Sequence, residues 1–319
     1  MKKSVNLKTF GLLFAIPMLC LGIPSCESTE NPNLTKPEHE PEQPQKTAVE
    51  YEATIDDCDT KTVLQGRSVI WSAGDEVAIF PGKDNAKIYK VKNGCEGQKT
   101  ATLVAVNEDE ATGGTLYGNV AFYPADYVTN VESQGQGFSI QAEIPDIQTY
   151  TAGTFANRAM PMVAVTSDVD DRKLPFKNLF GVMKIQVNIP GITIKSVEIK
   201  GNNGEKIAGR TSISYIYGGY PAADGCTAET MTLDCGNGLT QTGSQKLEMY
   251  VTLRPCTFTK GVTVRLTTTG KDIVRKISET VTVPRSSVLN MPTITEVPDF
   301  DGNGTEDLEE NDCPYTWTY

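Results

Sequence analysis

Short segments of alternating apolar and polar residues recur along this chain, and they constrain its fold more than any other feature. In residues 49–55 the sequence VEYEATI places an apolar side chain at every second position, which is the period of a half-buried strand. Gly, Asn and Asp cluster between such segments, for example at residues 82–85 and 93–97. No segment keeps a helical period over three turns. Strands spaced every roughly 8–12 residues predict an all-β fold, either a sandwich or a barrel.

The expected strands fall into two regions. The first region holds residues 49–55, 62–64, 68–71, 76–80, 87–91, 100–106, 118–123 and 137–144. The second holds residues 182–187, 193–200, 247–253, 261–268, 273–283 and 288–294. Residues 205–209 should pair with 193–200 as a hairpin, because the connection GNNG carries the Asn-Gly turn signal. We therefore expect two β-domains, residues 48–170 and 171–297.

The N-terminal segment has the features of an export signal. Three lysines lie among the first eight residues, and the apolar run from Phe10 to Ile23 is too short to cross a bilayer. The run ends in Ile23-Pro24-Ser25-Cys26, which resembles the lipobox of bacterial lipoproteins. That resemblance implies removal of residues 1–25 and acylation of Cys26. The alternative is an ordinary signal peptide that is cut nearby and leaves a secreted protein.

Residues 26–47 are expected to form a disordered stalk between the anchor and the first domain. The segment is rich in Pro and Glu and poor in apolar residues, so it cannot pack a core. Such a semi-extended segment reaches on the order of 60 Å.

Two features of the composition exclude classes of function. The only histidine is His39, inside the stalk, so no folded pocket can use Ser-His, Cys-His or histidine-ligated zinc chemistry. The formal net charge is −11, which argues against nucleic acid as a partner because phosphate contacts require clustered Lys and Arg. Paired carboxylates remain as a catalytic alternative, but no spacing singles out a pair.

The cysteine count permits disulfides in an exported chain. Besides Cys20 and Cys26, the chain contains Cys58, Cys95, Cys226, Cys235, Cys256 and Cys313. Cys226 and Cys235 form the favoured local pair, since they would close a short loop. The alternative is that several of the six are free and buried as small apolar side chains.

The acidic tail, residues 298–319, contains a candidate calcium loop. The oxygen-bearing residues at positions 1, 3, 5, 7, 9 and 12 of the loop are Asp299, Asp301, Asn303, Thr305, Asp307 and Glu310, and Gly304 stands at position 6. Two departures are Glu306 at the normally aliphatic position 8 and the lack of flanking helical patterns. The spacing also resembles the calcium repeats of thrombospondin type 3. The alternative is an acidic linker without an ion, and no other cofactor is indicated.

A set of ordered motifs gives the chain a family resemblance. The motifs are TKT at 60–62, WSAGDEVAIF at 71–80, AFYP at 121–124, QTY at 148–150, LPFKNLFGV at 174–182, KIAG at 206–209 and PRSS at 284–287. In this order they resemble the fimbrillin family of pilus subunits and accessory adhesins of Gram-negative anaerobes. The resemblance implies two tandem transthyretin-like β-sandwiches, an outer-membrane location and other fimbrillin-like subunits as partners.

The resemblance also implies a mechanism of assembly. In polymerising members a protease cuts after a basic residue behind the first strand, and a neighbour's strand then fills the groove by β-augmentation. Here the first strand is followed by Lys61 and Arg67, and either residue can serve as the cleavage site. The segment Tyr315–Tyr319 alternates aromatic residues with threonine and is a candidate donor strand, or else it completes its own domain.

The sequence thus predicts a non-enzymatic, lipid-anchored pilus subunit or accessory adhesin. The alternative is a surface glycan-binding lipoprotein, in which aromatic residues such as Trp71 and Trp317 hold sugar rings. The other interpretation of these aromatic residues is that they pack in the core.

Overall fold

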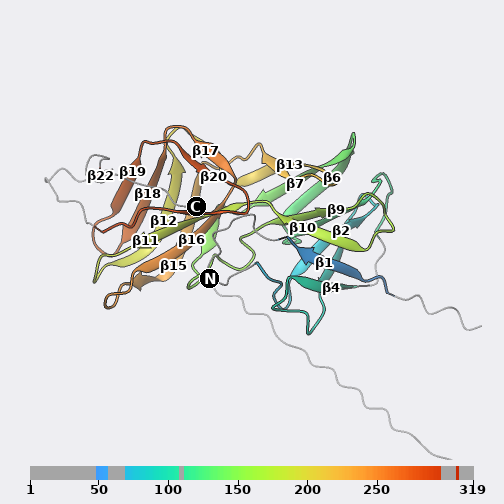
Figure 1. Ribbon diagram of the computed structural model, residues 1–319, viewed down its shortest axis with the longest axis horizontal. Coiled ribbons are helices and arrows are strands. Elements are labelled where there is room, and N and C mark those ends of the chain that lie inside the picture. The colour runs from blue at the N-terminus through green and yellow to red at the C-terminus, as the bar shows by residue number, and fades with distance from the viewer. Residues whose placement is uncertain (1–47, 57–68, 108–110, 296–306, 309–319) are drawn as a thin grey trace, which may run out of the picture. The chain divides into compact units, whose positions relative to one another are not determined.

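A computed structural model describes residues 48–56, 69–107, 111–295 and 307–308 of the chain. These residues form strands, turns and loops and contain no helix (Figure 1), so the predicted all-β class is confirmed. The number of domains and the transthyretin-like type remain predictions.

Within the described ranges, no helix is long and apolar enough to span a membrane.

Seven strands form a sheet that closes on itself. Their order is β1 (Tyr51–Ile55), β10 (Lys173–Asn178), β9 (Met162–Val165), β5 (Asn119–Tyr123), β2 (Glu76–Pro81), β3 (Lys87–Val91) and β4 (Thr100–Ala105), and β4 returns to β1. β1 runs parallel to β10 and antiparallel to β4, whereas every other neighbouring pair in this sheet is antiparallel. The first strand of the folded chain is therefore the strand that closes the sheet.

Aromatic side chains fill the interior of the closed sheet. Trp71, Phe122 and Phe176 are fully buried there, and the rings of Trp71 and Phe176 meet edge to face with their centres 5.2 Å apart. Edge-to-face contact suits the quadrupoles of aromatic rings and adds to the hydrophobic contribution.

The remaining long sheets surround a second hydrophobic cluster. The six-stranded sheet has the order β22 (Asp307–Leu308), β19 (Ile273–Ile277), β18 (Val262–Thr268), β12 (Thr193–Gly201), β15 (Thr230–Thr240) and β8 (Ile147–Thr149). The three-stranded sheet is β16 (Leu247–Leu253), β11 (Gly181–Val187) and β21 (Val288–Asn290), and β17 (Cys256–Phe258) pairs with β20 (Val281–Val283). Alternate residues of these strands, such as Ile185, Val197 and Val264, are buried in the cluster.

A four-stranded sheet joins strands from distant parts of the chain. It consists of β14 (Ala222–Asp224), β13 (Gly209–Ile216), β7 (Gly137–Ile144) and β6 (Val128–Gln134). Ile140 of β7 and Ile213 of β13 are register partners and both belong to the first hydrophobic cluster. Strands from both sides of residue 170 thus share one sheet.

Several expected strands differ from the observed ones. Residues 69–71 are not a strand, and the expected strand 62–64 lies outside the described residues. The residues between 273 and 283 form two strands rather than one. The strands that the sequence did not predict are β6, β8, β9, β10, β13, β14, β15, β17 and β22.

The predicted hairpin after residue 200 is wrong. The turn is present, with Gly204 at a positive φ of 73°, but β12 pairs with β15 and β18 instead of with residues 205–209. Ile207 and Ala208 are buried, and their amides donate to the carbonyl of Ala228. Burial of these two side chains carries the chain away from β12, because a local turn signal does not fix the partner of the next segment.

Candidate functional site

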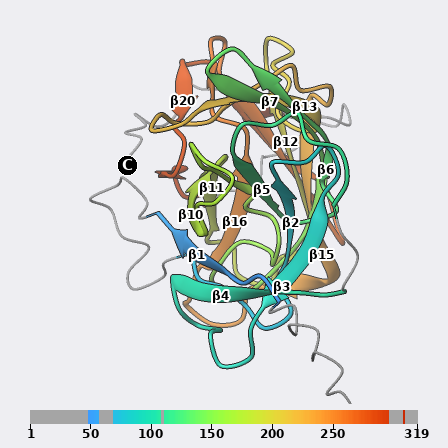
Figure 2. The same ribbon diagram turned by 90° about the vertical axis from the view of Figure 1, so that its right-hand side faces the viewer.

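β1 occupies a groove between two other strands of the closed sheet. Figure 2 shows it between β10 and β4, and the register pairs Ala53 with Leu174 on one side and with Ala101 on the other. Tyr51, Ala53 and Ile55 are buried, whereas Glu52 and Thr54 are exposed. The alternation predicted from the sequence is confirmed at these five positions. Loss of β1 would leave two unpaired strand edges and an apolar groove.

An arginine holds the beginning of β1. Arg172 donates a hydrogen bond from Nη1 to the hydroxyl of Tyr51 at 2.6 Å, and its guanidinium lies 5.0 Å from the centre of the same ring. Burial raises the pKa of the Tyr51 hydroxyl, and the positive charge of Arg172 opposes that rise. The ring of Tyr51 also meets Tyr89 edge to face, with centres 5.1 Å apart.

Lysines pair with acidic residues at both borders of β1. Lys177 of β10 forms an ion pair with Asp56, the residue after β1, and its ammonium lies 5.5 Å from the ring centre of Tyr220. At the other border, Lys92 and Glu50 are 3.0 Å apart. The Asp56–Lys177 pair is the less exposed of the two, with side chains 37% and 22% exposed, and so is less weakened by solvent.

The chain is anchored again immediately after the segment that follows β1. Trp71 is fully buried, its amide donates to the carbonyl of Gln98 at 2.9 Å, and the amide of Gly97 donates back to its carbonyl at 2.8 Å. Asp56 and Trp71 are therefore fixed points on either side of residues 57–68. The candidate cleavage residues Lys61 and Arg67 lie in that segment, outside the described residues.

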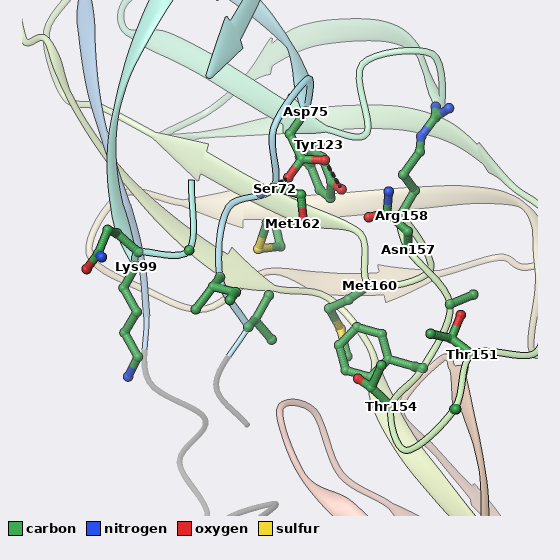
Figure 3. Close-up of a pocket in the computed structure, with 17 residues that line it drawn as sticks. Ser72, Asp75, Lys99, Tyr123, Thr151, Thr154, Asn157, Arg158, Met160 and Met162 are labelled. Carbon is green, nitrogen blue, oxygen red and sulfur yellow. Dashed lines mark hydrogen bonds between the residues drawn. The ribbon is translucent and has the colours of Figure 1, made fainter. Parts of the chain in front are cut away.

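A cavity of about 710 Å³ lies beside this second fixed point (Figure 3). Its walls combine apolar side chains, such as Ile70 and Met160, with polar ones such as Asn157 and Arg158. Arg158 has a positive φ of 66°, which is uncommon for a residue other than glycine. A cavity of this size suits a small ligand, but no described side chain in it forms a nucleophile–base pair.

Asp75 is the buried acid of this cavity. Its carboxylate accepts hydrogen bonds from the hydroxyl of Tyr123 at 2.8 Å and from the amide of Ser72 at 2.7 Å, and Figure 3 shows the contact with Tyr123. Burial raises the pKa of Asp75, and the two hydrogen bonds partly oppose the rise. Burial and the nearby carboxylate raise the pKa of Tyr123 far above its usual range. The pair fixes the turn before β2 and has the geometry of a structural contact.

An exposed aromatic group lies near the end of β1. Tyr217 and Tyr220 follow β13 and are 51% and 59% exposed. The guanidinium of Arg285 lies 4.5 Å from the ring centre of Tyr220. Two cations, Lys177 and Arg285, thus hold this ring in place.

The remaining predicted site residues are Cys26, the calcium-loop residues and Trp71. Cys26 and the calcium-loop residues lie outside the described residues, except Asp307, whose backbone belongs to β22 beside β19. In the described part of the chain no three His, Cys, Asp or Glu residues group to hold a metal ion. Trp71 lies in the core and not on a sugar-binding face.

The predicted Cys226–Cys235 disulfide is not formed, since both thiols are free. Cys226 Sγ is 2.9 Å from the hydroxyl of Thr211 in β13, whereas Cys235 lies inside β15 and packs in the second hydrophobic cluster. Cys226 and Cys235 are close in the sequence, but β15 places Cys235 in surroundings that differ from those of Cys226. Burial raises the pKa of both thiols, to about 11 for Cys235.

Sequence reasoning missed the residues that hold β1. Lys177 lies in the motif LPFKNLFGV, and Arg172 directly precedes β10. Both residues are basic, but only the parallel pairing of β1 with β10 shows that they lie beside β1.

Comparison with known proteins shows that the chain is similar to several solved structures. No family model matches the chain, and no curated protein matches it. A candidate cell adhesion protein of Bacteroides ovatus is 11% identical with a TM-score of 0.48, and the match covers 78% of this chain and 91% of the other. The chain resembles cell adhesion and fimbrial proteins.

Two further solved structures also match this chain. A candidate cell adhesion protein of Bacteroides uniformis is 16% identical with a TM-score of 0.43, covering 80% of this chain and 94% of that one. The C-terminally truncated tip fimbrial protein Mfa3 of Porphyromonas gingivalis is 12% identical with a TM-score of 0.29, covering 79% and 97%.

Proposed function

We propose that this chain is a fimbrillin-like surface lipoprotein, a non-enzymatic pilus subunit or accessory adhesin that assembles through the groove of β1. Lipid on Cys26 holds the precursor at the outer membrane, and the stalk of residues 26–47 extends the folded part from it. Cleavage after Lys61 or Arg67 frees β1, and an extended segment of another subunit then occupies the groove. The placement of β1 as the first strand, parallel to β10 and antiparallel to β4, carries this proposal.

The covalent connection between β1 and Trp71 through residues 57–68 explains why cleavage would release β1. A five-residue strand that buries three side chains gains only about 1.5–3 kcal/mol from each large one. While residues 57–68 connect it to Trp71, rebinding is intramolecular, with an effective concentration on the order of millimolar. After cleavage, rebinding becomes bimolecular and a competing strand can replace β1. The burial of Trp71 meanwhile anchors the chain at residue 71.

Limited trypsin treatment of the full chain tests the proposal. We expect loss of the fragment that contains residues 49–56, followed by filaments or a ladder of higher species on gels. The matched control is the double variant Lys61→Gln, Arg67→Gln, which should keep the fragment and stay unassembled under the same treatment. A chain that loses β1 but forms no higher species, alone or with related subunits, contradicts assembly through this groove.

A second candidate function, glycan binding, is favoured by the exposed ring of Tyr220. Two cations hold this ring while it remains largely exposed, and such a ring can stack on a sugar. Affinity electrophoresis on a panel of polysaccharides should show retardation that Tyr220→Ala abolishes. The buried Tyr123→Phe serves as control, and uniform absence of retardation counts against this function.

A further inference from the structure

We propose that the β1 groove selects an incoming strand with a small residue at its central inward position and an acidic residue at each border. The C-terminal segment of this chain does not match that pattern, so residues 315–319 of a second copy do not supply the strand, and the occupant is a segment of a partner subunit that does match. This inference rests on the proposed function and specifies the partner of the same site.

The central position of the groove is narrow. Ala53 is fully buried, and its register partners on the two sides are Ala101 and Leu174, which are also buried. Side chains of register partners on one face of a sheet lie close together, with Cβ atoms roughly 4.5–5.5 Å apart. Ala53 and Ala101 are 0% and 2% exposed, so neighbouring core atoms cover these two short side chains. A large side chain at this position would have to displace core residues.

The borders of the groove are positively charged. Lys177 faces Asp56 at one border and Lys92 faces Glu50 at the other. When β1 leaves, Lys177, whose side chain is 22% exposed with the strand in place, loses its carboxylate partner. A partly desolvated charge without a partner is unfavourable, so the groove favours a strand that restores an acid there. The Lys92 border is more exposed and contributes less.

The C-terminal segment of this chain does not fit these requirements. Its sequence from Tyr315 to Tyr319 is YTWTY. Every register that turns the aromatic side chains inward and reaches the central position puts Tyr or Trp at the place of Ala53. With Tyr315 at the place of Tyr51, the residue at the place of Glu50 is Pro314, which has no carboxylate. With the opposite face inward, one threonine takes the place of Ala53 and the other takes that of Tyr51 or Ile55, where β1 buries a larger side chain.

Peptide binding to the cleaved full chain tests this selection. After limited trypsin treatment, mass spectrometry verifies that the fragment with residues 49–56 has left. Labelled peptides are then titrated: residues 49–56, the same peptide with Ala53→Trp, with Thr54→Trp or with Asp56→Lys, and residues 312–319. Thr54→Trp is the matched control, because it adds the same ring on the exposed face.

The expected order of peptide affinities follows from the narrow central position and the positively charged borders of the groove. The native peptide and Thr54→Trp should bind within about threefold of each other, whereas Ala53→Trp and the 312–319 peptide should bind about tenfold more weakly or worse, since overpacking a core is destabilising. Asp56→Lys should also weaken binding, and the cleaved Lys177→Glu protein should restore it. That reciprocal rescue would not follow from a general loss of fold.

Two results overturn the inference in different ways. If all five peptides bind alike, the groove does not select, although strand exchange itself stands. If none binds, the native peptide included, then both the inference and the proposed function fail. Should trypsin leave the strand attached, the intact chain still decides the steric part: Ala53→Trp must lower the thermal midpoint more than Thr54→Trp, and equal midpoints overturn it.

Discussion

At the scale of single residues, Lys177 determines how firmly β1 is held. It joins Asp56 at the end of β1 to the ring of Tyr220, so one side chain links the first strand to the turn after β13. The sequence predicted the inward residues of β1 correctly, because alternation is a local pattern. It could not predict Lys177 as the partner of Asp56, because the two residues are distant in the sequence.

The variant Lys177→Gln should loosen β1. We expect the free energy of unfolding to fall by about 1 kcal/mol, since a partly exposed ion pair and a cation–π contact are lost. Trypsin should also release residues 49–56 faster. Urea denaturation and time-resolved mass spectrometry measure the two effects. Lys90→Gln, an exposed lysine of β3, is the control, and equal behaviour of the two variants would refute the role of Lys177.

Asp75 should make stability depend on pH in a direction opposite to that of most acids. Burial raises its pKa in the folded state above the usual value of about 3.9, so the folded protein binds its proton more tightly than the unfolded chain does. The contribution of Asp75 to stability is then fully present below that value and is lost as pH rises through the raised pKa.

Asp75→Asn isolates this effect. The stability advantage of the wild type over the variant should shrink as pH rises from about 4 to 6, which urea titrations at several pH values measure. Glu76→Gln, an exposed neighbour, controls for general changes in charge. An advantage that grows over this range would show that the carboxylate is stabilised as the anion.

At the scale of elements, local patterns defined strands but not their partners. The GNNG turn formed as predicted, yet the following residues left β12 because Ile207 and Ala208 are buried elsewhere. β15 was missed because its sequence includes Gly236 and Gly238, both at positive φ, which read as a turn. Gln148 in the motif QTY has a structural role: its side chain bonds the amide and the carbonyl of Thr252 in β16.

Trp71 anchors the chain after residues 57–68, the segment of the proposed cleavage. Trp71→Ala should lower the free energy of unfolding by about 3–5 kcal/mol, because a fully buried large side chain is removed. Trp71→Phe should cost less, since the indole nitrogen has no hydrogen-bond partner to lose among the residues that the structure describes. Ile70→Ala, at a position 46% exposed, is the control. Chemical denaturation gives the values, and a small effect for Trp71→Ala would mean that residue 71 is not an anchor.

The acidic tail remains the candidate metal element. Calorimetry with calcium should show heat for the full chain and none for a chain that ends at Val297, because the six proposed ligands lie beyond it. Asp301→Asn with Asp299→Asn should abolish the heat in the full chain. Equal heats for the full and shortened chains would end the calcium proposal.

At the scale of the whole molecule, the order of strands carries the functional argument. The sequence predicted the all-β class, because it follows from period and turn spacing. It could not predict that β1 closes a sheet by running parallel to β10, nor that β7 pairs with β13, because those pairings join segments far apart in the chain. The groove that holds β1 is formed by these long-range pairings.

The N-terminal sequence of the protein recovered from cells tests the central claim most directly. The claim is that β1 leaves before assembly and that its groove holds another subunit. Protein from assembled surface structures should begin at Thr62 or Ser68, behind Lys61 or Arg67, while the precursor begins at acylated Cys26. Assembled protein that still begins at Cys26 and retains residues 49–56 would contradict the claim.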